Sequence, residues 1–386
     1  MALVIVSKNK SRCHLCMRAG NSPYNKAGVI VPIDKDRIVD RYDYKGGEII
    51  ILRPVIDKLI FEYRFQDCEG HVSKVQDAAL NNAHAMVAGL PTMFKPTNNS
   101  NVGYRRNYFL HRHYKHNYVL TYKPTGAKTI IQLGPHNKKS AFMNCDLNPA
   151  RLGPKGMDFF RDMIRALVNN DFYDISFDTI AAVPKSLKRI DIAVDMLGVD
   201  ASDLEARYVF KGKELKKNVI QSHTGRTQTQ QFMLGEADKN AAYFYNKKQA
   251  FLDLGKAQDP IDGGQKSPYG EALYTRFEYR VEDTEKPISN LKSFINHLKK
   301  VDFRAVDYSQ ISGKDYTHPL FLRYAITRSL EKALELIPNG KKADYANSYE
   351  AAMLDIWKPE KIWEQGWLAE LESLGLYNPP KSKKKK

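Results

Sequence analysis

Three segments of the sequence alternate apolar residues with residues that could do chemistry. In 189–195 (RIDIAVD), the aliphatic positions are separated by Arg189, Asp191, Ala193 and Asp195. In 241–249 (AAYFYNKKQ), alternate positions hold Tyr243, Tyr245 and Lys247, and in 275–281 (TRFEYRV) they hold Arg276, Glu278 and Arg280. Because successive side chains of a strand point to opposite faces, each segment predicts a β-strand with one polar face.

If these three strands are neighbours, one face of a sheet carries carboxylates, guanidinium groups, an ammonium group and phenols. This combination suits phosphoryl transfer. Carboxylate oxygens bind Mg²⁺ or Mn²⁺, cations stabilise charge on a phosphodiester, and a tyrosine oxygen can bond covalently to phosphorus. The alternative interpretation is a set of solvated strand faces with cross-strand ion pairs.

Further segments predict the sheet and the helices that must position these strands. Short runs of β-forming residues occupy 28–33, 48–56, 58–65, 118–122, 128–134 and 141–147. Apolar residues recur every three or four positions over 153–170, which predicts a helix, and a weaker helical pattern covers 77–90. Helical spacing returns over 286–301, 318–337 and 356–375. No internal repeat is visible.

The predicted fold is α+β: an antiparallel or mixed catalytic sheet with helices packed on one face, plus a C-terminal helical region. We expect three parts along the chain. Residues 1–28 form an irregular basic segment, 29–288 the catalytic region, and 289–386 the helical region with its basic tail, KSKKKK. The tail would add nonspecific attraction to phosphates, or act only as a solubilising tail.

Composition limits the class of protein. The 386 residues include 60 Lys and Arg against 44 Asp and Glu, a net charge of +16, and 42% hydrophobic residues exclude a mostly disordered chain. No apolar run approaches the roughly 18–20 residues of a membrane span, and the opening MALVIVSKNK is too short for a secretory signal. Four cysteines do not make a disulfide framework. We therefore expect a cytoplasmic protein with a polyphosphate partner and no membrane association.

The chemistry-bearing segments resemble one known family. YNKKQ at 245–249 resembles the active-tyrosine segment of rolling-circle replication initiators of plasmids, and the preceding stretch resembles that family's hairpin. RIDIAVD and RFEYRV resemble its Arg-x-Asp-x-x-x-Asp and Arg-x-Glu strands, in the expected order. The segment 147–167 is similar to initiators of filamentous phages, and some relaxases belong to the same grouping. The resemblance covers residues 50–290 in outline.

The resemblance implies a rolling-circle DNA replication initiator. Such an enzyme nicks one strand at an origin through a tyrosine, forms a 5′-phosphotyrosine link and rejoins DNA at termination. It implies a bacterial cytoplasm, origin DNA that is single-stranded or cruciform at the nick, a host helicase, a single-strand-binding protein and a homodimer. The alternatives are a conjugative relaxase with the same chemistry and a noncatalytic basic DNA-binding protein.

The resemblance also assigns roles to residues. Tyr245 would be the nucleophile, Lys247 its phosphate-facing neighbour, and Tyr243 the alternative nucleophile. The ligands of Mg²⁺ or Mn²⁺ would be Asp191, Glu278 and Asp195, of which Asp195 could instead be a structural partner of Arg189. The residues of these strands expected to bind DNA are Arg189, Arg276 and Arg280.

Two further segments carry side hypotheses. Cys13, Cys16, Cys68 and His71 have the pair-plus-pair form of a structural zinc site, although 51 residues separate the two pairs. The segment 104–118 (YRRNYFLHRHYKHNY) interleaves cations with aromatic rings, which is typical of a nucleic-acid surface. The candidate DNA contacts in it are Arg105, Arg106, Arg112, His113 and Lys115. Metal binding by His111 and His113, or a solvated strand pair, are the alternatives.

Overall fold

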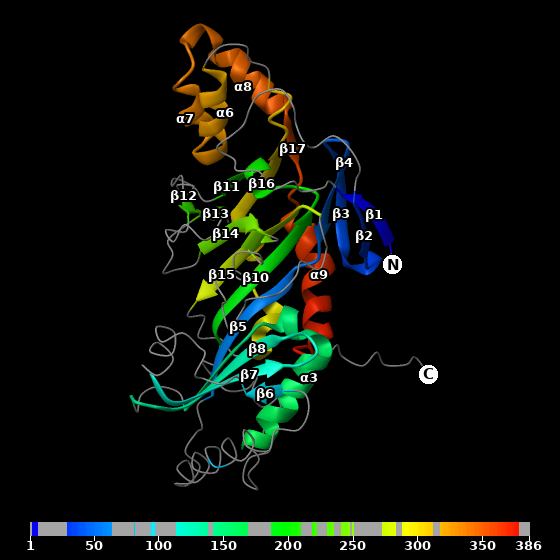
Figure 1. The fold of residues 1–386 in the computed structure, drawn as a ribbon, viewed down its shortest axis with the longest axis vertical. Coiled ribbons are helices and arrows are strands. Elements are labelled where there is room, and N and C mark those ends of the chain that lie inside the picture. Colours follow the sequence, from blue (N-terminus) through cyan, green and yellow to red (C-terminus); the bar gives the residue numbers. More distant parts are fainter. Residues whose placement is uncertain are drawn as a thin grey trace.

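A large antiparallel sheet runs through the centre of the molecule (Figure 1). The computed structural model describes residues 2–6, 29–63, 81, 94–96, 113–137, 142–168, 187–209, 218–221, 230–234, 241–247, 249–250, 272–282, 288–311 and 317–377. These residues place twelve strands in this sheet. The path of ten is β12 (Asn218–Gln221), β13 (Gln230–Leu234), β14 (Ala241–Asn246), β15 (Tyr274–Glu282), β10 (Leu187–Leu197), β5 (Val55–Tyr63), β9 (Met143–Leu147), β8 (Ala127–Pro135), β7 (Tyr114–Tyr122) and β6 (Phe94–Pro96).

The path of ten strands consists of two halves with the same strand order. In one half, β5 leads in sequence and lies beside β9, the last of its strands, followed in space by β8, β7 and β6. In the other half, β10 leads and lies beside β15, followed by β14, β13 and β12. The two leading strands pair with each other at the centre. We call the half from β5 to β9 the amide half and the half with β10 and β12 to β15 the tyrosine half.

The alternation in the sequence decides which face of the sheet packs into the apolar core. Ile190, Ile192 and Val194 of β10 are fully buried, and so is Phe277 of β15. Helices α3 (Pro149–Val168) and α9 (Pro359–Ser373) pack into the same core as these residues, on the same side of the sheet in Figure 1. The predicted α+β fold, with helices on one face of the sheet, is therefore confirmed.

The helix predicted over 153–170 is present as α3. It begins earlier, at Pro149, because Asn148 caps its first turn by accepting the N–H of Arg151 at 2.9 Å. Gly153, with a φ of 67°, then kinks the helix. The predicted apolar stripe lies in the core, with Met157, Phe160, Met163 and Ile164 all buried.

The remaining strands form smaller pairings around the large sheet. Strand β4 (Gly47–Leu52) pairs with β10 and with β3 (Ile38–Tyr44), and β1 (Ala2–Val6) pairs with β2 (Val29–Ile33). Short 3₁₀ turns lie at η2 (Lys35–Arg37) and η4 (Ala201–Asp203). The segment expected to be irregular, 1–28, therefore contains a strand.

A three-stranded sheet packs against the tyrosine half. It consists of β11 (Leu204–Tyr208), β16 (Val301–Val306) and β17 (Met353–Asp355). Phe303 of β16 contacts Phe244 and Phe277, and Trp357 contacts Phe277 and Phe303. The expected boundary between residues 288 and 289 stays a prediction, and residues on both sides of it share this aromatic core.

The C-terminal region carries the expected helices and some unexpected elements. Helices α6 (His318–Thr327), α7 (Leu330–Leu334) and α8 (Lys342–Ala351) contribute to a separate hydrophobic cluster at one end of the molecule (Figure 1). The short η7 (Asn339–Lys341) lies between α7 and α8 in sequence. The helical spacing over 286–301 instead gives two 3₁₀ segments, η5 (Ile288–Ser293) and η6 (His297–Lys300). Asn296 separates them, because its side chain caps η6 by accepting the N–H of Leu298 at 3.1 Å.

Several expectations concern residues outside the described ranges. They are the zinc set of Cys13, Cys16, Cys68 and His71, the DNA contacts Arg105, Arg106 and Arg112, the basic tail, and all but one residue of the helix expected over 77–90. Within the described ranges, we find no helix of the length and apolarity that a membrane crossing requires.

Candidate active site

The three strands predicted to carry chemistry are neighbours in the sheet. Strand β15 lies between β14 and β10, and all three run antiparallel. Their register places Tyr245 opposite Arg276, and Arg276 opposite Asp195. Two residues further along, Tyr243 lies opposite Glu278. Since directly opposed residues of an antiparallel pair share a face, the predicted polar face is assembled.

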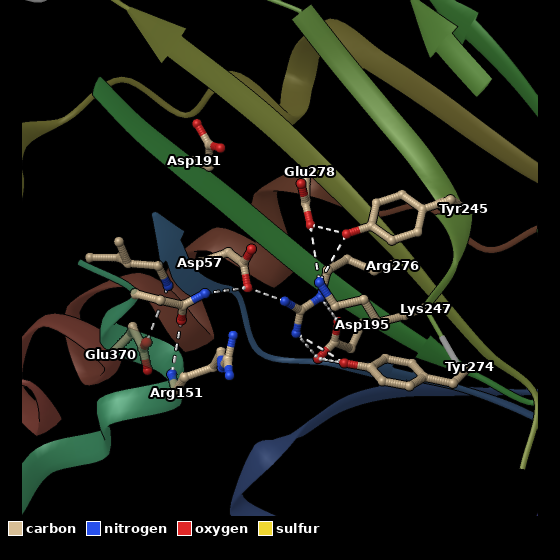
Figure 2. Close-up of polar contacts among 12 residues, drawn as sticks. Asp57, Arg151, Asp191, Asp195, Tyr245, Lys247, Tyr274, Arg276, Glu278 and Glu370 are labelled. Atoms are coloured by element: carbon tan, nitrogen blue, oxygen red, sulfur yellow. Dashed lines mark hydrogen bonds and ion pairs between the residues drawn. The ribbon is translucent and has the colours of Figure 1, made fainter. Parts of the chain in front are cut away.

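The hydroxyl of Tyr245 lies between the carboxylate of Glu278 and the ammonium group of Lys247 (Figure 2). It donates a short hydrogen bond to Oε1 of Glu278 and accepts one from Nζ of Lys247 at 2.9 Å. The Lys247 Nζ is also 3.7 Å from Glu278 Oε1. Tyr245 is only 9% exposed, yet its hydroxyl is in polar surroundings rather than in the apolar core.

A turn at the end of β14 brings Lys247 back to the tyrosine. Asn246 Oδ1 accepts the N–H of Gln249 at 2.9 Å, which folds the chain back directly after the strand. Asn246 Nδ2 donates to Asp200 at 3.1 Å and so ties the turn to η4. Lys247 consequently lies over the ring of Tyr245, with Nζ 5.3 Å from the ring centroid.

Arg276 is held by two carboxylates. Its Nε donates to Asp195 Oδ1 at 2.6 Å and its Nη2 to Asp195 Oδ2 at 2.9 Å. Its Nη1 donates a short hydrogen bond to Asp57, and Tyr274 donates its hydroxyl proton to Asp195. Bidentate pairs of this kind fix both partners. Asp195 is thus the partner of Arg276 rather than of Arg189, and the expected contact of Arg276 with DNA stays a prediction.

Asp57 is a site residue that sequence reasoning missed. Strict alternation would put it on the buried face, opposite to its neighbour Lys58. The pairs Asp191↔Lys58 and Ile192↔Ile56 show an extra residue in β5, a β-bulge. The bulge turns Asp57 toward Arg276 and toward Asn148, whose Nδ2 donates to it at 3.4 Å. A lone carboxylate within the apolar run VIDKLIF was the available signal.

A second cluster lies further along the same face. Arg189 Nε donates to Asp191 Oδ1 at 2.8 Å, and Arg280 Nε is 3.7 Å from the same oxygen. Arg280 also stacks over Tyr243, 4.9 Å from its ring centroid, and its Nη1 lies 3.5 Å from the Tyr243 hydroxyl. Tyr243 therefore contacts a cation, whereas Tyr245 contacts both a carboxylate and a cation.

The predicted metal ligands do not converge on one point. Asp191 and Asp195 lie four residues apart in β10, about 13 Å at the usual rise per strand residue, and each is paired with an arginine. The described ranges contain no group of three or more His, Cys, Asp or Glu side chains that could hold a metal ion. The carboxylates close to Tyr245 are Glu278 and Asp57, so a divalent ion at this tyrosine would have these two as protein ligands. This number suits Mg²⁺, which takes one or two carboxylates together with substrate phosphates.

Burial and neighbouring charges shift the pKa values of Tyr245, Glu278 and Asp57 in different directions. Burial, with the charges of Glu278 and Asp57, raises the pKa of Tyr245 well above its ordinary value. Burial and the neighbouring Asp57 also raise the pKa of Glu278. Burial opposes the ionisation of Asp57, but Lys247 and Arg276 lower its pKa below the usual range. Tyr245 is thus a neutral hydrogen-bond donor beside a carboxyl with increased proton affinity.

The other described candidate residues lie away from this site. His113 and Lys115, from the segment expected to bind DNA, are exposed at the beginning of β7 in the amide half. Their role stays a prediction.

Comparison of the chain with protein-family models, with curated proteins and with solved structures finds no match. The resemblance to rolling-circle initiators therefore stays an expectation.

Proposed function

We propose that this protein is a DNA strand-nicking and strand-joining enzyme with Tyr245 as nucleophile, of the kind that initiates rolling-circle replication. The observation that carries the proposal is the position of the Tyr245 hydroxyl between Glu278 and Lys247 on one face of an antiparallel sheet. The buried Tyr245 phenol contacts both a carboxylate and an ammonium group, and burial with the neighbouring carboxylates raises its pKa. Groups with perturbed pKa values cluster at functional sites.

These contacts support the following reaction. The Tyr245 oxygen attacks the phosphorus of a phosphodiester, the new bond joins this oxygen to phosphorus, and the bond to the 3′ oxygen breaks. Glu278 is placed to accept the phenol proton, and the 3′ oxygen leaves with the electron pair and takes up a proton as a free hydroxyl. Lys247 stabilises the negative charge that develops on the phosphate oxygens. Strand joining is the reverse transfer.

A divalent ion belongs to this proposal. Mg²⁺ or Mn²⁺, when bound, supplies further charge stabilisation at the phosphate. Glu278 and Asp57, the two carboxylates close to Tyr245, would hold it, and Asp57 would do so while also contacting Arg276. Origin DNA, a host helicase, a single-strand-binding protein and a second copy of the chain are the partners that the resemblance adds.

Adduct formation tests the proposal. Supercoiled DNA that carries the cognate origin, or a single strand spanning the nick site, is incubated with the protein and Mn²⁺, and an SDS-resistant protein–DNA adduct is expected. Peptide mapping should place the adduct on Tyr245, and Tyr245→Phe should abolish it while Tyr243→Phe retains it. An adduct on Tyr243 would overturn the assignment. DNA binding without any adduct would favour the noncatalytic alternative.

A further inference from the structure

Helix α9 approaches the beginning of β5 unusually closely. A Cβ atom added at Gly366 would overlap Cδ of Pro54 and would lie 3.2 Å from Cβ of Arg53. Only glycine allows the helix to approach the chain this closely at this point. The contact brings the next turn of the helix, with Glu370, beside the bulge of β5.

Glu370 is a partly buried acid whose carboxylate interacts with a backbone amide, with the side chain of Ser373 and with the charge of Arg37. Its Oε1 accepts the N–H of Ile56 at 3.2 Å (Figure 2). A buried carboxyl group requires a hydrogen-bond partner, and a bulge interrupts the regular ladder of amide hydrogen bonds in its strand. The side chain from α9 therefore satisfies an amide at the irregular part of β5.

Ile56 directly precedes Asp57, the residue that the bulge turns toward Arg276. We propose that Glu370 is a positioning residue for the candidate active site: by fixing the bulge from outside the sheet, it sets the direction of the Asp57 side chain. The expected effect of Glu370 on the rate of adduct formation rests on the proposed function. Its expected effect on the bulge of β5 does not.

Three variants separate this role from general stabilisation. Glu370→Leu keeps the approximate volume and removes the acceptor, Glu370→Gln keeps an acceptor oxygen, and Glu372→Leu alters an exposed position on the same helix as a matched control. Because misplacement of a catalytic group by about 1 Å can cost about 100-fold, Glu370→Leu should lower kcat for adduct formation roughly 10- to 100-fold, with KM for DNA unchanged. Glu370→Gln should restore the rate, and Glu372→Leu should match the wild type.

A double-mutant cycle tests whether Glu370 acts through Asp57. If it does, Glu370→Leu should add little to the rate loss of Asp57→Asn. Independent, multiplicative losses would overturn the proposal, as would a Glu370→Gln variant as slow as Glu370→Leu. If Glu370→Leu does not fold, Glu370→Asp, with a carboxylate one methylene shorter, should show the same partial, Asp57-dependent loss.

Amide hydrogen exchange separates this inference from the proposed function. The Ile56 amide should be protected in the wild type and in Glu370→Gln, and should exchange at least about tenfold faster in Glu370→Leu, since it has lost its acceptor. Unchanged exchange at Ile56 would overturn the positioning role. Absence of any adduct in the wild type, with the expected exchange result, would overturn only the proposed function.

Discussion

The two halves of the large sheet share their strand order and differ in the chemistry of the same face. In the tyrosine half, this face carries carboxylates, arginines and Tyr245. In the amide half, three adjacent strands carry Asn117, Gln132 and Asn144 in a direct cross-strand row. Gln132 Nε2 donates to Asn117 at 2.6 Å, and Asn144 Nδ2 donates to Gln132 at 2.7 Å.

The two halves share a strand order, so the difference between them lies in the residue types on this face. Neutral amides satisfy one another's hydrogen-bonding groups without a change in protonation. The charged groups of the other half perturb each other's pKa, which is typical of catalytic sites. The strand order is thus the same in both halves of the sheet, and the residue types on the polar face of the tyrosine half provide the candidate chemistry.

Removal of Arg276 should cause the largest loss of stability on either face. Arg276 is 7% exposed and pairs with both Asp195 and Asp57, so Arg276→Leu leaves the buried Asp195 without its bidentate partner and Asp57 with Lys247 as its nearby cation. We expect a decrease of about 3–5 kcal/mol in the free energy of unfolding. Urea denaturation at pH 7 measures this decrease. A smaller decrease than that of Gln132→Leu in the amide half would show that the charges around Arg276 contribute less to stability than the neutral amides do.

Lys247 should matter for rate. Lys247→Gln removes the cation at the Tyr245 hydroxyl, and we expect adduct formation to slow by about 100-fold or more, comparable to the loss of one preorganised transition-state contact. The matched control is Lys58→Gln in the amide half, where the lysine pairs with Asp146 at 2.6 Å. Equal rate losses for both variants would remove the functional difference between the halves.

The amide row should contribute stability without contributing to chemistry. Gln132→Leu leaves Oδ1 of the buried Asn117 and Nδ2 of the partly exposed Asn144 without their present partner. We expect a loss of about 1–3 kcal/mol in the free energy of unfolding and unchanged kinetics of adduct formation. A slower reaction in this variant would mean that the amide half takes part in catalysis.

The smallest expected effect is a difference in pH dependence. The pKa of Glu278 is raised in the folded chain, so folding favours its protonated form. The folded state therefore loses stability as the pH rises above about 4.3, the ordinary pKa of Glu. The loss is about 1.4 kcal/mol for each unit by which the pKa in the folded chain exceeds the pKa in the unfolded chain. Glu278→Gln should gain stability relative to the wild type between pH 4 and pH 7. The effect of Gln132→Leu should stay constant over this range, because amides do not titrate.

Patterns with a simple period could be predicted from the sequence. The alternation of β10, β14 and β15 identified their polar faces, and the three-to-four spacing identified α3, because burial follows these periods directly. Asp57 could not be found this way, because the extra residue of the bulge in β5 reverses the direction in which the side chains before Lys58 point. The double carboxylate contact of Arg276 depends on strand register between segments far apart in the sequence. The two 3₁₀ segments replaced an expected helix because Asn296 caps the second of them.

The central pairing of β5 with β10 has a consequence for biosynthesis. Asp57, Tyr245 and Glu370 come from the first third, the middle and the last part of the chain, and they meet only when both halves and α9 have folded together. A nascent chain on the ribosome therefore holds separate pieces of the site, and we expect nicking competence to arise only after residue 370 has emerged. A ribosome-bound chain arrested before α9 that still formed the DNA adduct would contradict this timing.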